Sequence, residues 1–263
     1  MIVSAQKVKR YLDRVPPMQE TLRNCYFALG EGNLPLAARH AAADPALLYY
    51  LRQLTTRPLY GFPSEIKDPA QIFGILGLGG SRSAVENFLF SRLLPERFSV
   101  FEITPARFMA YQDEFLARWL QILRHLKADE MRYAALPPLL MGAIIVTDGI
   151  FGEERETVLA LRGVEAIDFN TLLERFAGVS LFETVMQIAR FWELPEPALA
   201  LLRALGDRQD EPLARWLHLL LFYMLSKPEM VSAGLNDFLT FDPDYAQPVT
   251  EAFFEMVNDA ADH

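Results

Sequence analysis

Apolar residues along the chain repeat with the period of an α-helix. In one stretch they recur every three or four residues, at Phe108, Tyr111, Phe115, Trp119, Ile122 and Leu126. Apolar residues between Leu213 and Leu225 follow the same spacing. Because this spacing places the apolar side chains on one helix face, both stretches predict long amphipathic helices with that face buried.

Proline-containing pairs mark where several helices begin. Asp44-Pro45, Asp68-Pro69 and Asp242-Pro243 each combine a capping carboxylate with proline in the first helical turn, and Leu194-Pro195 is a similar entrance. Strand signals are weak. The alternating segment FSVFEIT, residues 98–104, lies between two helical regions, and we interpret it as a linker. The pattern predicts an all-α fold with short connections.

The composition shifts near residues 95–106, where Pro95 and Pro105 bracket the extended segment. We therefore expect two packed helical bundles, an N-terminal one over residues 1–100 and a second one over residues 101–263. Aromatic residues are frequent after Glu211. We expect them to complete the core of the second bundle. The alternative is that part of this surplus forms a homodimer face.

The run LLMGAIIVTDGIFGEER, residues 139–155, begins with an apolar stretch and continues into a polar turn and charged residues. Its uncharged region extends only from Tyr133 to Thr147, and Pro137 and Pro138 interrupt it. A membrane-spanning helix needs about 20 apolar residues, so we interpret the run as a buried helix and expect no membrane insertion. Thr147-Asp148-Gly149 is interpreted as the turn that ends this helix.

Composition and charge narrow the classes of partner. The 263 residues are 51% hydrophobic, which is typical of a globular protein, and the formal net charge is −9. Nucleic-acid binding needs clustered Lys and Arg, so nucleic acid is not expected as a partner. The N-terminal residues carry charges too early for a secretory signal peptide, and we expect a cytoplasmic location.

The cysteine and the histidines suggest no metal chemistry. The single cysteine, Cys25, lies on an apolar helix face and is interpreted as a buried, unreactive thiol. None of the four histidines, His40, His125, His218 and His263, belongs to an HExxH or HxxxH pattern, and each is interpreted as structural or solvated. We therefore expect neither a metal nor a cofactor.

The glycines of LGLGGSR, residues 76–82, superficially suggest a phosphate-binding loop. The segment lacks the Gly-Lys-Ser/Thr of a P-loop, and a helix rather than a strand precedes it. A helix–turn–helix joint with a glycine C-cap fits the pattern better.

Four segments together resemble the HDOD domain, a bacterial relative of the HD phosphohydrolases. Residues 15–29 (VPPMQETLRNCYFAL) are similar to the opening Leu-Pro-x-Leu-Pro segment of that family, and residues 41–54 are similar to its Asp-Pro-x-Leu helix. Residues 59–78 contain a Tyr-Gly turn and a Leu-Gly helix end. Residues 174–205 carry the Gly-Val, Trp and Leu-Pro-Glu-Pro spacing. The resemblance implies an HDOD/HD-like fold and a role in bacterial regulation.

The departures from the family pattern imply that metal-dependent chemistry is lost. Metal-bearing HD relatives take two ligands from a Leu-Leu-His-Asp segment, which aligns with Leu139-Leu140-Met141-Gly142. A later histidine of the pattern aligns with Leu181, and further ones align with Ala204-Leu205-Gly206. A thioether, a glycine and aliphatic carbons do not replace imidazole and carboxylate ligands. We therefore expect these degenerate positions to be part of the core.

The resemblance and its departures favour a non-catalytic signal-transduction or regulatory module that acts by protein–protein interaction. The expected partner is a protein in a signalling pathway or a second copy of the chain. The candidate contact surface is the segment 55–67, with Arg57, Tyr60 and Phe62 as its interface-type residues. The alternative for this segment is an ordinary loop whose aromatic side chains pack into the core.

A second hypothesis assigns a different class of function. In it, the chain is a metal-independent nucleotide-binding protein or phosphohydrolase with a relocated site between the bundles. Polar groups such as Asp148, Glu183 or Arg190 would then serve that site.

Overall fold

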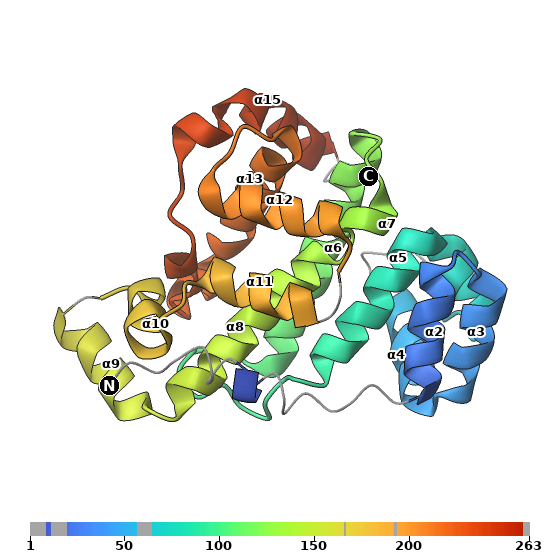
Figure 1. Ribbon diagram of the computed structural model, residues 1–263, viewed down its shortest axis with the longest axis horizontal. Coiled ribbons are helices and arrows are strands. Elements are labelled where there is room, and N and C mark those ends of the chain that lie inside the picture. The colour runs from blue at the N-terminus through green and yellow to red at the C-terminus, as the bar shows by residue number, and fades with distance from the viewer. Residues whose placement is uncertain (1–8, 12–19, 57–64, 166, 192–193, 260–263) are drawn as a thin grey trace. The chain divides into compact units, whose positions relative to one another are not determined.

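The structure is a computed structural model that describes residues 9–11, 20–56, 65–165, 167–191 and 194–259 (Figure 1). Every regular element in these ranges is a helix, which confirms the all-α prediction. Contacts group the chain into two compact units. Unit 1 comprises Met1–Arg14, Pro95–Tyr111 and Leu139–His263, and unit 2 comprises Val15–Leu94 and Gln112–Pro138. The sequence predicts two contiguous domains with a boundary after residue 100. Each observed unit instead combines separate segments of the chain, and residue 100 lies inside one segment of unit 1.

Unit 2 is built from the N-terminal helices and part of the following long helix. Its elements are α2 (Glu20–Gly30), α3 (Leu34–Ala43), α4 (Pro45–Thr55), α5 (Pro69–Ser91), the later part of α6 (Pro105–His125) and α7 (Glu130–Tyr133). The Asp44 carboxylate accepts hydrogen bonds of 3.0 Å from the N–H groups of Ala46 and Leu47. Asp68 likewise caps α5. Both helix starts are therefore where the sequence predicts them.

The glycine-rich segment lies within α5 and bends the chain. Gly77 has φ 67° and ψ −179°, a conformation that residues with a Cβ rarely adopt, and it separates two helical stretches. This confirms the helix–turn–helix joint. Cys25 on α2 is fully buried, and burial raises the pKa of its thiol to about 12, as expected for an unreactive cysteine.

The predicted amphipathic helix around Trp119 is α6, but it ends earlier than the pattern suggests. Phe108, Phe115 and Trp119 are buried, whereas Leu126 is 37% exposed. The chain leaves the helix at His125, and Lys127 takes a left-handed conformation with φ 53°. Leu126 therefore no longer follows the helical face, although the apolar spacing continues through it.

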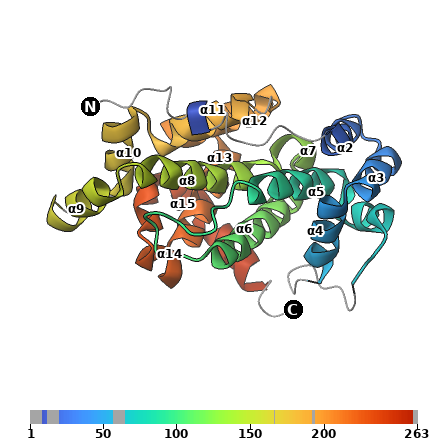
Figure 2. The ribbon, with the colours of Figure 1, turned by 90° about the horizontal axis from the view of Figure 1, so that it is seen from below.

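Unit 1 contains the remaining helices. They are the first part of α6, α8 (Leu136–Gly152), α9 (Arg155–Glu165), α10 (Phe169–Ala177), α11 (Leu181–Phe191), α12 (Glu196–Asp207), α13 (Pro212–Leu225), α14 (Pro228–Ser232), the 3₁₀ helix η2 (Leu235–Phe238) and α15 (Pro243–Asp259). α11 and α12 lie side by side, as both ribbon views show (Figure 1, Figure 2). α13 and α15 pack against each other.

Phenylalanine rings fill the centre of unit 1. The ring centroid of Phe101 lies 5.0 Å from that of Phe169 and 5.7 Å from that of Phe238, in edge-to-face geometry. Phe98 packs on Phe108 at 5.0 Å. The segment 98–104 is irregular, which confirms its interpretation as a linker, and its phenylalanines are part of the core.

The apolar run forms the buried helix α8, but the predicted end of that helix is wrong. Thr147, Asp148 and Gly149 are helical, and α8 continues to Gly152. The Thr147 hydroxyl donates to the carbonyl of Ala143 at 2.8 Å, which satisfies it inside the helix. Gly149 gives room for packing, because a Cβ there would lie 2.5 Å from the Tyr11 ring.

Among the described residues, no single helix is long and apolar enough to cross a membrane. α8 and α9 together have the length and composition of a broken span, but they are bent by 100°.

Half of the aromatic residues expected to complete the core of the C-terminal part are buried; they are Trp216, Phe238, Tyr245 and Phe253. Phe222, Tyr223 and Phe241 are half-buried, and Phe254 is 44% exposed. The alternative that some of these rings form a homodimer face stays a prediction.

Candidate functional site

The expected interaction surface was assigned to the segment 55–67. Arg57, Tyr60 and Phe62 lie outside the described residues. The surface that they were predicted to form stays a prediction.

The degenerate HD positions are buried except for Gly206, where the expectation of a core position is wrong. Met141 is 2% exposed in α8, its neighbour Gly142 is also buried, and Leu181 is 1% exposed at the start of α11. Ala204 and Leu205 on α12 are buried, whereas Gly206 is exposed. In the described part of the chain, no three His, Cys, Asp or Glu side chains are grouped as ligands for a metal ion.

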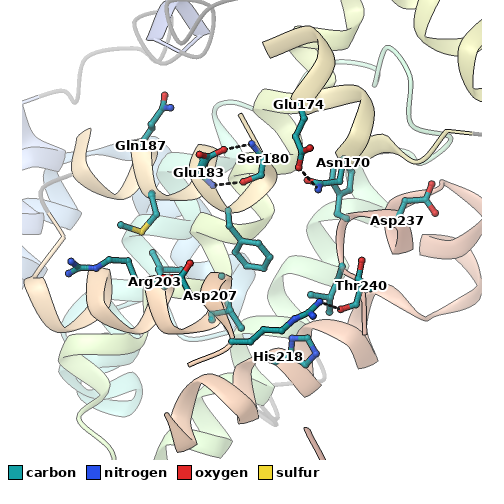
Figure 3. A pocket seen from close by; sticks show the side chains of 18 of the residues that line it. Asn170, Glu174, Ser180, Glu183, Gln187, Arg203, Asp207, His218, Asp237 and Thr240 are labelled. Atoms are coloured by element: carbon teal, nitrogen blue, oxygen red, sulfur yellow. Dashed lines mark hydrogen bonds between the residues drawn. The ribbon is translucent and has the colours of Figure 1, made fainter. Parts of the chain in front are cut away.

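A pocket of about 1000 Å³ opens in unit 1 beside α10, α11 and α12 (Figure 3). Figure 3 shows Asn170 and Glu174 at the upper right of the lining, Arg203 and Asp207 at the left, and His218 at the bottom of the view. A volume of this size is at the upper end of the range for ligand-binding pockets. The pocket is therefore the candidate functional site.

Helix caps hold the pocket wall in place. Asp168 caps α10, and Gly178 ends that helix in a left-handed conformation with φ 70°. Ser180 and Glu183 then form a reciprocal capping box at the start of α11. The Ser180 N–H donates to the Glu183 carboxylate at 2.6 Å, and the Glu183 N–H donates to the Ser180 hydroxyl at 3.2 Å. The cap at Asp168 and the connection from Gly178 to Ser180 thereby orient α10 and α11, two of the helices that line the pocket.

The pocket and the degenerate position Leu181 are on different faces of α11. The buried face of this helix carries Leu181, Thr184, Val185, Ile188 and Ala189. A different set of residues on α11 lines the pocket, at spacings of three and four; they are Phe182, Glu183, Met186, Gln187 and Arg190. The pocket therefore lies away from Leu181, although two of the later degenerate positions, Leu205 and Gly206, line it.

His218 is the least exposed polar side chain of the pocket lining. It is 1% exposed, and its Nε2 accepts the N–H of Asp242 at 3.3 Å. Its ring stacks on Phe241 with centroids 5.8 Å apart. Burial, together with the smaller effect of the nearby Arg208, lowers the pKa of His218 to about 4, while Asp242 opposes the shift. The ring is therefore neutral near pH 7.

With Nε2 acting as an acceptor, the proton of the neutral ring resides on Nδ1. No described residue accepts a hydrogen bond from that nitrogen. His218 was predicted to be structural, and its stacking and hydrogen bond agree with that. No local pattern indicated that His218 also lines a pocket, because most of the other lining residues are remote from it in the chain.

The three polar residues named for a relocated site do not lie together. Glu183 and Arg190 line the pocket. Asp148 does not line it, and its carboxylate accepts hydrogen bonds from the N–H groups of residues 99–101 at 2.8 to 3.3 Å. Burial raises the pKa of Asp148, while these three donors oppose the rise. Asp148 therefore anchors the linker.

No protein-family model and no curated protein matches this sequence. Among solved structures, the fold is similar to that of an HDOD domain protein of unknown function from Geobacter sulfurreducens, with a TM-score of 0.60. The two chains are 15% identical, and the similarity covers 95% of each. The chain therefore has the fold of an HDOD domain, which confirms at the level of fold the resemblance seen in the sequence.

Proposed function

We propose that the protein is a non-catalytic regulatory module that acts in bacterial signal transduction by binding a protein partner. The observation that supports this most directly is the burial of Met141 and Leu181, the positions that align with metal ligands in HD relatives. Apolar side chains fill these positions, and each large one contributes about 1.5–3 kcal/mol by its burial. These positions thus stabilise the unit instead of coordinating an ion.

The alternative, nucleotide binding or phosphoester hydrolysis at a relocated site, has weaker support. The size of the pocket favours it, and Glu183 and Arg190 line that pocket. The charge opposes it, because the described lining carries five carboxylates and three guanidinium groups. Phosphate-binding sites use an excess of positive charge or of backbone N–H donors, and both helix starts at this pocket already bind their own carboxylates.

Metal analysis and a substrate panel test the non-catalytic part of the proposal. Purified protein would be analysed for bound metal and assayed with a phosphomonoester, a phosphodiester and cyclic dinucleotides, in the presence of magnesium and of manganese. We expect no stoichiometric metal and no turnover. Turnover that depends on Glu183 or Arg190 would overturn the proposal in favour of the alternative.

Crosslinking in the cells that produce the protein tests the interaction part. We expect crosslinks to a specific partner, or between two copies of the chain. The double variant Arg57→Ala/Tyr60→Ala tests the predicted surface. Unchanged crosslinking together with unchanged stability would exclude that surface as the contact.

A further inference from the structure

The rim of the unit 1 pocket carries negative charge that the protein does not neutralise. Of its three guanidinium groups, Arg203 is paired with Glu196, and Arg208 with Asp242 at 3.2 Å. Neither carboxylate partner belongs to the described lining. Asp237 is paired with Arg162, which also lies outside that lining. Two of the three positive charges are thus already balanced by other groups.

Four other carboxylates of the lining form no ion pair with a described residue; they are Asp168, Glu174, Glu183 and Asp207. Each accepts hydrogen bonds only from uncharged donors, such as the Thr171 N–H at 2.8 Å and the Asn170 amide at 3.1 Å. Uncharged donors stabilise a carboxylate without cancelling its charge. The field over the pocket therefore favours a cation.

The pocket also offers apolar surface and one unused donor. Phe182 and Met186 are half-buried, and the buried core residues Leu202 and Phe238 also line the pocket. His218 contributes an N–H on Nδ1 that no described residue accepts. Because the His218 ring is neutral, it adds no charge that would repel a cation. A ligand matched to these features has a positive charge, an apolar part and a hydrogen-bond acceptor.

We propose that this pocket binds a basic segment of the partner protein, with a lysine or arginine side chain directed to the carboxylates and an apolar neighbour covering Phe182 and Met186. A peptide supplies all three features, since its backbone carbonyls are acceptors for His218. A volume of about 1000 Å³ has room for several side chains. The inference rests on the proposed function, because it specifies the chemistry of the partner.

The test uses the full chain and a fluorescein-labelled peptide of alternating lysine and leucine. Binding would be measured by fluorescence anisotropy, and its location by the methyl NMR resonance of Met186, with the buried Met141 as an internal reference. We expect saturable binding that shifts the Met186 resonance, leaves Met141 unchanged and weakens as salt is added. A peptide with glutamate in place of lysine should not bind.

Gly206 allows the pocket to be filled without disturbing the backbone. It lies in α12 at the pocket, and a Cβ there would lie 3.5 Å from the Phe182 Cβ, an ordinary contact. Gly206→Leu therefore places a side chain in the pocket and should weaken peptide binding at least about tenfold, a loss of about 1.4 kcal/mol. Gly163→Leu is the matched control, because a Cβ at Gly163 meets nothing within 4 Å. This control should bind like the wild type.

Removal of charge provides a second variant. Glu174→Gln/Asp207→Asn keeps the shape of the rim and should weaken binding about fivefold, as expected for the loss of two exposed ion pairs. Three results would overturn the inference. The first is that Gly206→Leu binds the peptide as tightly as the wild type does. The second is that the lysine and glutamate peptides bind equally. The third is that spermidine or inorganic phosphate shifts the Met186 resonance as readily as the peptide does.

The outcomes separate this inference from the proposed function. Phosphoester turnover by the wild type would refute the proposed function whatever the peptide does. Absence of peptide binding, with crosslinking to a partner intact, would refute the basic-segment inference alone.

Discussion

The Asp148 carboxylate in α8 accepts a hydrogen bond of 2.9 Å from the backbone N–H of Val100, 48 residues earlier in the chain. Ser99 and Phe101 donate to the same carboxylate at 2.8 and 3.3 Å. One buried side chain thus satisfies three consecutive N–H groups of an irregular segment. The relationship explains how the linker is held in unit 1 without a strand partner.

Removal of this carboxylate should destabilise unit 1 strongly. Asp148→Ala leaves the three N–H groups without their acceptor, and we expect a loss of about 3 kcal/mol in the free energy of unfolding. Urea unfolding followed by circular dichroism measures the loss. Glu251→Ala, which removes an exposed acid from α15, is the control and should stay within about 0.5 kcal/mol of the wild type. A loss for Asp148→Ala no larger than that of the control would contradict the anchoring role.

Gly234 should not tolerate a side chain. Its φ is +76°, and a Cβ there would lie 2.6 Å from the Phe169 ring and 2.7 Å from the Arg162 guanidinium. Gly234→Ala combines left-handed strain with overpacking, and we expect a loss of about 3 kcal/mol in urea unfolding. Gly163→Ala, in open space on α9, should be neutral or stabilise the protein by up to about 1 kcal/mol. Equal effects of the two substitutions would show that the contacts around Gly234 are not as described.

His218 should make stability depend on pH between its two pKa values. The ordinary pKa is 6.5 and burial lowers it to about 4 in the folded protein, so the unfolded chain binds a proton in this range and the folded protein does not. The contribution of His218 to the free energy of unfolding is therefore fully present above pH 6.5 and is lost as the pH falls from 6.5 towards 4. We expect a contribution of about 2 kcal/mol, less than the full pKa difference implies, because the ring lines an open pocket.

His218→Gln keeps an acceptor for the Asp242 N–H but does not titrate. The slope of unfolding free energy against pH, measured between pH 6.5 and 4, should be smaller in this variant than in the wild type. His40→Gln on α3 controls for the removal of a histidine elsewhere. An unchanged slope in His218→Gln would mean that other groups produce the acid sensitivity.

Restoration of the HD residues should not restore a metal site. Met141→His/Gly142→Asp buries an imidazole and a carboxylate where Met141 is now 2% exposed, and Leu181 offers no further ligand. We expect a loss of at least about 3 kcal/mol and no tight binding of manganese by calorimetry. A stable variant that binds the metal would show that the space at these positions is not the packed core described above.

Much of the helical structure could be predicted from local patterns. The start of α4 was correctly placed because Asp44 and Pro45 act on residues within one turn. The bend at Gly77 was likewise predicted, since it depends on the conformational freedom of a single residue. The end of α8 was not, because Gly149 and Gly152 resemble turn residues in the sequence but serve to admit Tyr11 and Ser99.

The helical character of the chain, the starts of several helices and the positions that lack HD metal ligands follow from local sequence, because these properties depend on near neighbours and on residue type. What Asp148 binds and where the candidate site lies depend instead on how distant segments pack. The pocket combines residues from Asp168 to Thr240, on α10, α11, α12, α13 and η2, and its charge depends on ion pairs such as Arg208–Asp242. Such a site forms only when separate helices pack, so no local pattern marks it.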